Sequence, residues 1–324
     1  MQLVSIIVPV YGVERYIKRC AVSLFEQTYK DIEYIFVDDA TSDKSIEILE
    51  EVIARYPLRQ KNIKIIHHPQ NKGISATRNT GLQAVTGDYI LYVDSDDYVA
   101  LNAVEKLVQC SQTKDADILL FDTNIVTIKG ISHESVYYET KAQYIKNLLQ
   151  HTAKCAHWNK FYRATFYKST NVLADERIRL ADDYAVTPRL VHQAKKIAVL
   201  HEALYFYETT NQSSYVHNLT RASVESQYLA DKILIGYFTS APDADQYADV
   251  VSVLPQRSMV SLIKNADRSS WPDILDVYSG CLSMPKSQGM TLVNRIIFKL
   301  AVGKHYRSLQ GFLYFYHLAM RVHP

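Results

Sequence analysis

The sequence predicts an α/β fold, a mostly parallel sheet flanked by helices, followed by a helical extension. Two observations predict it. Short runs of branched and aromatic residues alternate with helical patterns over residues 4–101, an order typical of parallel sheets covered by helices. Polar residues follow the end of each predicted strand, and that edge is where open sheets of this kind bind ligands.

The expected elements follow one another without a long gap. In the first part of the chain we expect strands at residues 4–10, 32–37, 63–67 and 89–93, with helices at 13–28, 43–56 and 75–86. The fourth strand is an unbroken apolar run, which indicates burial on both faces. Farther on we expect strands at 118–121 and 197–207, a hairpin at 125–138, and helices at 102–110, 141–150 and 182–192, with helices again from residue 220 onward. The aromatic segment 158–163 lies between the helices expected at 141–150 and 182–192.

Composition limits the class of protein. The apolar fraction of 48% is that of a globular chain. The four cysteines are far apart and form no C-x-x-C pair, so neither a disulfide framework nor a cysteine zinc site is expected. We see no signal peptide and no run of 18 or more apolar residues, so the sequence predicts a cytoplasmic protein without a membrane span.

The acidic run Asp94, Ser95, Asp96 and Asp97 directly follows the strand predicted at residues 89–93. Carboxylates crowded at the end of a buried strand repel one another, so a partner must offset the cost. Mg²⁺ or Mn²⁺ is such a partner, because both prefer oxygen ligands and complete their shells with water and substrate phosphates. The alternative is an acidic loop that caps the next helix.

Four motifs in order carry a resemblance to a known family. They are SIIVPVY at residues 5–11, VDDATSD at 37–43, NKGISATRN at 71–79 and VDSDD at 93–97. Together they resemble the GT-A glycosyltransferases of family 2. The resemblance implies a GT-A catalytic domain over residues 1–218, with a nucleotide-sugar half at about 1–100 and an acceptor half at about 101–218. Residues 219–324 would form a helical, basic C-terminal region.

The resemblance implies a nucleotide-sugar donor, most often a UDP-sugar. In that interpretation Asp39 accepts a hydrogen bond from the imide N–H of the base, Tyr11 lies against the base, and Pro9 shapes the turn that admits it. The alternative for Asp38 and Asp39 is helix capping.

Diphosphate and metal contacts are also implied. Lys72 and Arg78 would lie near the diphosphate, although either could be a solvated surface charge. Asp94 and Ser95 would contact the nucleotide, and Asp96 would ligate Mn²⁺ or Mg²⁺, which neutralises charge on the leaving diphosphate.

Transfer needs a base that takes the proton of the acceptor hydroxyl. The resemblance assigns this role to Asp183, with Asp182 beside it as an acceptor-binding group, where the family more often shows Glu-Asp. Both would lie in the first turn of a helix, where carboxylates are favoured in any case. One carboxylate opposite the leaving group implies inversion at the anomeric carbon.

Two further residues are acceptor or lid candidates. Trp158 looks family-like and could line the acceptor pocket, or it could be an ordinary core residue. His217 could reach the metal or diphosphate from a lid, or it could simply be exposed.

The C-terminal tail has an uneven charge. The chain carries a net charge of +2, yet no acid follows Asp276, whereas the tail has Lys286, Arg295, Lys299, Lys304, Arg307 and Arg321. Apolar helical faces bordered by these cations can lie in a membrane interface, and the alternative is packing on the catalytic domain. The sequence contains no recognisable nucleic-acid-binding motif, so no nucleic-acid partner is expected.

The sequence therefore predicts an inverting, metal-dependent glycosyltransferase at the inner face of the cell membrane. Its acceptor would be a glycan, lipid-linked, in bacterial surface polysaccharide synthesis. The alternatives are transfer to a polyprenyl phosphate and a non-catalytic scaffold that binds sugar nucleotides. The sequence predicts no oligomeric state.

Overall fold

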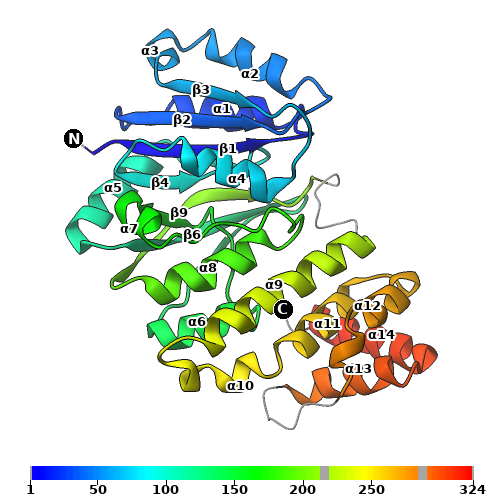
Figure 1. Ribbon diagram of the computed structural model, residues 1–324. Helices are drawn as coiled ribbons and strands as arrows, with labels where there is room; N and C mark the ends of the chain where they lie inside the picture. Colours follow the sequence, from blue (N-terminus) through cyan, green and yellow to red (C-terminus); the bar gives the residue numbers. More distant parts are fainter. Residues whose placement is uncertain (1, 212–218, 284–289, 323–324) are drawn as a thin grey trace.

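A computed structural model describes residues 2–211, 219–283 and 290–322. It confirms the predicted α/β fold, with one mixed sheet and a group of C-terminal helices (Figure 1). The strands are β1 Val4–Val10, β2 Ile32–Asp38, β3 Ile63–His67, β4 Tyr89–Tyr92, β5 Tyr98–Val99, β6 Ile118–Thr127, β7 Gly130–Glu134, β8 Lys160–Arg163 and β9 Ile197–Glu208.

Helices follow the strands through the catalytic part and make up the rest of the chain. They are α1 Ile17–Phe25, α2 Ser45–Ile53, α3 Pro57–Gln60, α4 Ile74–Gln83, α5 Ala103–Lys114, α6 Lys141–Leu149, α7 Ala164–Ser169, α8 Asp182–Gln193, α9 Arg221–Thr239, α10 Ala248–Val251, α11 Leu254–Asn265, α12 Trp271–Val277, α13 Leu292–Val302 and α14 Tyr306–Val322. Short 3₁₀ turns lie at η2 Ala244–Gln246, η3 Arg268–Ser270 and η4 Ser279–Cys281.

The sheet has the strand order β3-β2-β1-β4-β8-β6-β9-β5, with β7 paired to β6 as a hairpin. The four strands from β3 to β4 are parallel. β8 then pairs antiparallel with both β4 and β6, so the sheet is mixed beyond its four parallel strands. The predicted strand at 118–121 is longer than expected, because β6 continues to Thr127 along β9.

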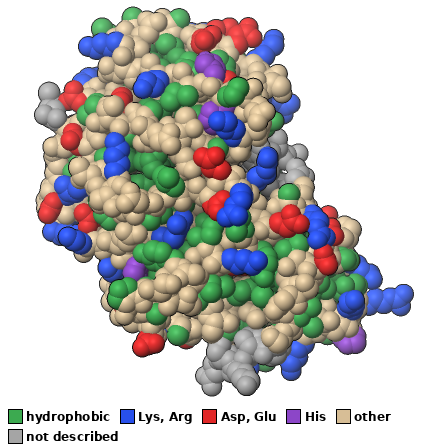
Figure 2. Space-filling model, in the orientation of Figure 1, with side chains coloured by type: hydrophobic (Ala, Val, Ile, Leu, Met, Phe, Trp, Pro, Cys, Tyr) green, Lys and Arg blue, Asp and Glu red, His purple; other side chains and the backbone are tan. Residues whose placement is uncertain are grey.

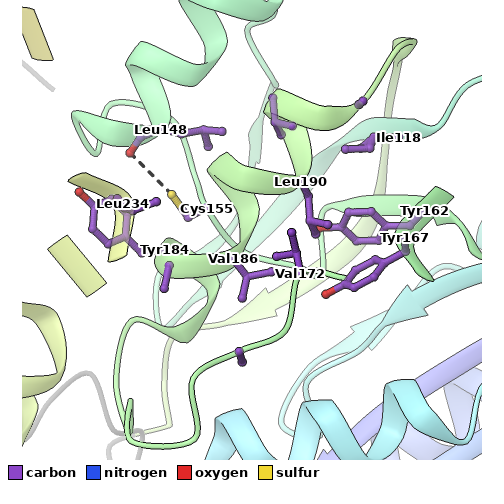
Figure 3. Packing of buried hydrophobic residues seen from close by; sticks show 14 of the residues in the cluster. Ile118, Leu148, Cys155, Tyr162, Tyr167, Val172, Tyr184, Val186, Leu190 and Leu234 are labelled. Carbon is purple, nitrogen blue, oxygen red and sulfur yellow. Dashed lines mark hydrogen bonds between the residues drawn. The ribbon is translucent and has the colours of Figure 1, made fainter. Parts of the chain in front are cut away.

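The sheet core is buried on both faces, as the apolar runs predicted. Every residue of β1 is buried, and its side chains alternate between two clusters: Ile7 joins one, whereas Ile6 and Val8 join the other. Helix α4 approaches β1 closely at Gly81, where a Cβ atom would overlap the Cγ2 methyl of Ile7. Figure 3 shows part of the first cluster, in which Tyr184 of α8 lies near Leu234 of α9, while Leu190 of α8 lies near Tyr162.

The C-terminal helices divide between two cores. Ala230, Leu234 and Phe238 of α9 belong to the cluster that covers one face of the sheet. Trp271, Ile297 and other residues of α11 to α14 form a third cluster of their own. The first helices after residue 218 thus share a core with the catalytic part, and the domain boundary at 218 stays a prediction.

The apolar faces predicted in the tail lie mainly inside the protein. Ile297, Leu309 and Leu313 are buried in the third cluster, so they pack among the C-terminal helices and not on the catalytic domain. A different set of large apolar side chains points outward, namely Leu292, Tyr314, Phe315 and Leu318. Figure 2 shows Lys and Arg side chains over these helices, at the lower right. No helix in the described part of the chain is long and apolar enough to cross a membrane.

Candidate active site

Four loops meet at the carboxyl edge of the parallel strands, as predicted. β1 lies between β2 and β4, with Val10 opposite Asp38 and Ile7 opposite Tyr92. The residues that follow these strands therefore emerge side by side. A cavity of about 670 Å³ opens beside them; it is lined by Gly12, Glu14, Arg15, Tyr16, Asp43, Thr210 and Asn211.

Asp39 holds the loop that carries the third motif. Its carboxylate accepts hydrogen bonds from the backbone N–H groups of Lys72 and Gly73, both at 2.8 Å, and His68 Nδ1 lies 2.7 Å from Oδ1. Asp38 similarly accepts a bond from the backbone of Thr41. Neither acid caps α2, whose first turn is held by Asp43 instead. The helix-capping alternative is therefore wrong.

Two other donor-site residues lie next to Asp39. Pro9 is buried within β1, while the Tyr11 ring just beyond it is 42% exposed and can be covered by a ligand. The sequence analysis missed His68, which is buried between Asp39 and Thr80. Its position one residue past a strand end was the available signal.

The acidic loop contains carboxylates with two different surroundings. Asp97 accepts bonds from the Tyr205 hydroxyl at 2.6 Å and the Glu208 backbone at 2.7 Å, so it anchors the loop to β9. Asp96 accepts one bond, from the Asn211 amide at 2.9 Å. Burial, and then the charge of Asp94, raise the pKa of Asp96. Ser95, between Asp94 and Asp96 in the sequence, is also buried.

This loop fits a divalent cation held by few protein ligands. Among the described residues no group of three or more His, Cys, Asp or Glu side chains is arranged to hold a metal ion. Mg²⁺-type sites that bind substrate phosphates use only one or two carboxylates. The repulsion that raises the pKa of Asp96 is what a cation would relieve.

Arg19 contacts the acidic loop, and the sequence did not predict a role for this residue. Its guanidinium donates to the Asp96 carbonyl at 2.9 Å, forms an ion pair with Glu208 at 2.9 Å, and lies 4.4 Å from the centroid of the Tyr98 ring. It holds the backbone of the loop at the Asp96 carbonyl, while the Asp96 carboxylate is bonded to Asn211 and not to Arg19.

Asp182 and Asp183 open α8, after Ala181 in the left-handed conformation with φ 69°. Burial, and then Asp182, raise the pKa of Asp183 to about 6, although Arg78 opposes the rise. The backbone N–H of Tyr184 donates to Asp183 Oδ1 at 2.7 Å. A carboxylate with this pKa can accept a proton near neutral pH.

Arg78 joins the acidic loop to α8. Its guanidinium bonds Asp182 at 2.5 Å and Asp94 at 3.0 Å, and its side chain is only 10% exposed. Burial lowers the pKa of Arg78, but Asp182, Asp94 and Asp183 outweigh burial and leave it well above its usual value. The alternative of a solvated surface charge is wrong for Arg78, whereas Lys72 is exposed at the rim.

Trp158 lies in the core behind the acidic loop. Its ring stacks on Tyr205 at 4.8 Å and Tyr207 at 5.1 Å between centroids, and it is 6% exposed. Since Tyr205 bonds Asp97, the stack supports the loop, which agrees with the core alternative. The other acceptor or lid candidate, His217, lies outside the described residues.

The family profile described as Glycosyl transferase family 2 matches residues 5–169. This chain belongs to glycosyl transferase family 2. It is a glycosyltransferase, as the motifs predicted. An uncharacterized glycosyltransferase, EpsJ, of Bacillus subtilis (strain 168) is 35% identical over 219 residues, which cover 65% of this chain and 62% of the relative. The chain thus spans less than two thirds of that relative's length.

TarS is similar in both sequence and structure. Poly(ribitol-phosphate) beta-N-acetylglucosaminyltransferase TarS of Staphylococcus aureus (strain MW2) is 28% identical over 220 residues, 67% of this chain and 37% of the relative. The crystal structure of S. aureus TarS 1-349 in complex with UDP-GlcNAc has a TM-score of 0.72 at 19% identity and covers 98% of this chain and 92% of that one.

A more distant structure has the same fold. The mannosyltransferase PcManGT from Pyrobaculum calidifontis, in complex with GDP-Man and Mn²⁺, has a TM-score of 0.57 at 13% identity and covers 96% of this chain and 85% of that one. At such identities the likeness to solved structures shows a shared fold.

Proposed function

We propose that this glycosyltransferase moves a sugar from a UDP-sugar to a hydroxyl of a glycan acceptor, with inversion at the anomeric carbon. The observation that carries the proposal is the Asp183 carboxyl, whose pKa is raised to about 6 at the start of α8. A base is most effective when its pKa lies near the working pH. Arg78 connects the start of α8 to the acidic loop, because its guanidinium bonds both Asp182 and Asp94.

The proposed reaction is a single displacement. Asp183 takes the proton of the acceptor O–H while that oxygen bonds to the anomeric carbon. The bond from this carbon to the phosphate oxygen breaks, and UDP leaves with the electron pair. Since one carboxylate serves as base and no protein nucleophile takes part, the configuration inverts.

We place the donor at Pro9, Tyr11 and Asp39, with its diphosphate near Lys72 and the acidic loop. Asp39 already receives three hydrogen bonds, and a carboxylate has about four lone-pair sites, so one remains for the imide N–H of the base. Asp94 and Ser95 would contact the nucleotide, and Asp96 would hold Mn²⁺ or Mg²⁺, which would neutralise charge on the departing diphosphate. The UDP-GlcNAc named with TarS and the Mn²⁺ named with PcManGT support a nucleotide-sugar donor and a divalent cation.

The acceptor is proposed to be a surface polymer or a lipid-linked glycan. TarS is named for poly(ribitol-phosphate), an anionic polymer. We propose peripheral contact with the inner face of the cell membrane through Leu292, Tyr314, Phe315 and Leu318, beside the tail cations. Binding to anionic vesicles that is lost in a Tyr314→Ser, Phe315→Ser variant would support this contact.

The test of the reaction measures UDP release from UDP-GlcNAc and UDP-glucose with and without Mn²⁺, together with the anomeric configuration of the product. We expect metal-dependent release that is abolished by Asp96→Ala and Asp183→Asn, and an inverted product. Release by Asp183→Asn at the wild-type rate would contradict the assigned base. Tight UDP binding without turnover of any donor would favour the scaffold, and transfer to a polyprenyl phosphate would favour the other alternative.

A further inference from the structure

A loop from the acceptor half covers the third motif of the donor half. Asn79 exchanges two hydrogen bonds with the backbone of Ala174, at 2.9 and 3.1 Å. Ser75 donates to the carbonyl of Ile178 at 2.5 Å, across 103 positions of sequence. Residues 174–181, which lead into the proposed base, therefore lie against the first turns of α4, the helix that begins directly after Gly73.

These contacts place Arg179 over Gly73. The Arg179 Cγ atom lies 3.8 Å from the position that a Cβ on residue 73 would occupy. The Arg179 backbone is fixed from the other side, because its N–H donates to the Ser226 hydroxyl of α9 at 3.1 Å. Gly73 itself has φ 89° and donates to Asp39, so this is also the donor-site loop.

Arg179 differs from its neighbours in having no partner for its charge. It is exposed, and within the described ranges its guanidinium makes no hydrogen bond or ion pair. The same holds for the exposed ammonium group of Lys72, next to Gly73. By contrast, Arg78 is bound to two carboxylates, and Arg177 is paired with Asp175 at 2.6 Å.

Two exposed side chains of like charge thus extend from backbone positions beside the same glycine, Lys72 as its neighbour in sequence and Arg179 through the contact of its Cγ atom. Their repulsion is relieved by an anion. Phosphate is the anion that suits them, because a guanidinium binds phosphate oxygens in a bidentate manner and an ammonium adds a point charge. Arg78 already bonds Asp182 through Nη1 and Asp94 through Nη2, and only its buried Nε is left without a bond, whereas the guanidinium of Arg179 is exposed.

We propose that Arg179, assisted by Lys72, binds a phosphate group of a substrate at the rim of the crevice. This inference rests on the proposed function, which supplies two sources of phosphate: the diphosphate of the donor and the phosphodiesters of an anionic acceptor. In either case Arg179 precedes the proposed base, Asp183, by four residues. The contact with phosphate would orient the substrate toward Asp183.

The test compares Arg179→Ala and Arg179→Lys with a matched control, Arg177→Ala, an exposed arginine of the same loop that is paired with Asp175. Affinities for UDP, UMP and uridine are measured by titration calorimetry in the presence of Mn²⁺. Loss of one charge-assisted contact weakens binding about tenfold or more. If the donor is the source, Arg179→Ala weakens UDP binding by that factor, uridine binding is unchanged, and Arg179→Lys recovers part of the loss.

A second titration tests whether the acceptor is the source of the phosphate. A poly(ribitol-phosphate) oligomer is added to enzyme saturated with UDP, and if the acceptor is the source, Arg179→Ala weakens this binding while UDP affinity is unchanged. The proposal is wrong if Arg179→Ala matches Arg177→Ala for both probes. Failure of the proposed function gives a different result, because the wild-type protein would then turn over no donor, whatever the affinity of the Arg179 variants for UDP.

Discussion

Arg78 gives the sharpest test of how the site is held together. Arg78→Met keeps the bulk of the side chain but removes a charge that bonds Asp182 at 2.5 Å and Asp94 at 3.0 Å. Breaking a buried ion pair from one side costs about 3–5 kcal/mol, since the partner stays buried without compensation. Native domains have a total stability of about 5–15 kcal/mol, so the variant should be markedly weakened.

The same variant should change the pH dependence of turnover. Arg78 opposes the burial and the Asp182 charge that raise the pKa of Asp183. Removing the guanidinium therefore raises this pKa further above its value of about 6. Because the base acts when it is deprotonated, the pH at which turnover is half-maximal moves upward.

Urea unfolding at pH 7 and a pH profile of UDP release check both effects. The matched control is Arg177→Met, which removes an arginine that is 73% exposed and paired with Asp175; such a pair contributes about 0–1 kcal/mol. The reasoning about the buried ion pair is refuted if Arg78→Met loses no more stability than this control. It is also refuted if the acidic side of the pH profile of UDP release does not move in Arg78→Met.

Three further predictions concern α8 and the helix that packs on it. In the wild-type enzyme, turnover should rise through about pH 6 as Asp183 loses its proton, and a flat profile from pH 5 to 8 would contradict the assigned base. Ala181→Gly should stabilise the protein by up to about 1 kcal/mol, because alanine is strained at φ 69°, whereas Ala185→Gly inside the helix should cost about 1 kcal/mol or more; equal effects in thermal unfolding would argue against strain. Asp231 is fully buried and bonded to Ser258 and Tyr278, and burial raises its pKa from 3.8 to about 8. Between these two pKa values the unfolded chain has lost the proton that the folded chain keeps, so the free energy of unfolding falls as pH rises from about 4 to 8. Asp231→Asn should remove this contribution to the pH dependence of the free energy of unfolding, measured in urea. An unchanged pH dependence in the variant would contradict the raised pKa of Asp231.

The sequence was sufficient for the fold class and for the edge of the sheet that binds ligands. Apolar runs alternating with helical patterns leave few alternatives to a parallel sheet, and acids directly after strand ends must meet at its carboxyl edge. The places of Asp39 and Asp96 at this edge could be predicted in this way, whereas the roles of Asp39, Asp96 and Asp183 came from the resemblance to the family and stay predictions. The pairing of β8 could not be predicted, because antiparallel insertion depends on contacts between distant segments.

The partners of each charge were decided only by the tertiary structure. The printed sequence shows Arg78 and Arg179 only as two basic residues, yet Arg78 is buried between Asp94 and Asp182, whereas Arg179 is exposed and forms no ion pair with any residue that the structure describes. Likewise, the apolar pattern of the tail predicted amphipathic helices but not that Leu309 and Leu313 would face inward. Periodicity along a chain fixes which side chains share a face; what that face meets, and hence the burial and pKa of each group, depends on segments a hundred residues away.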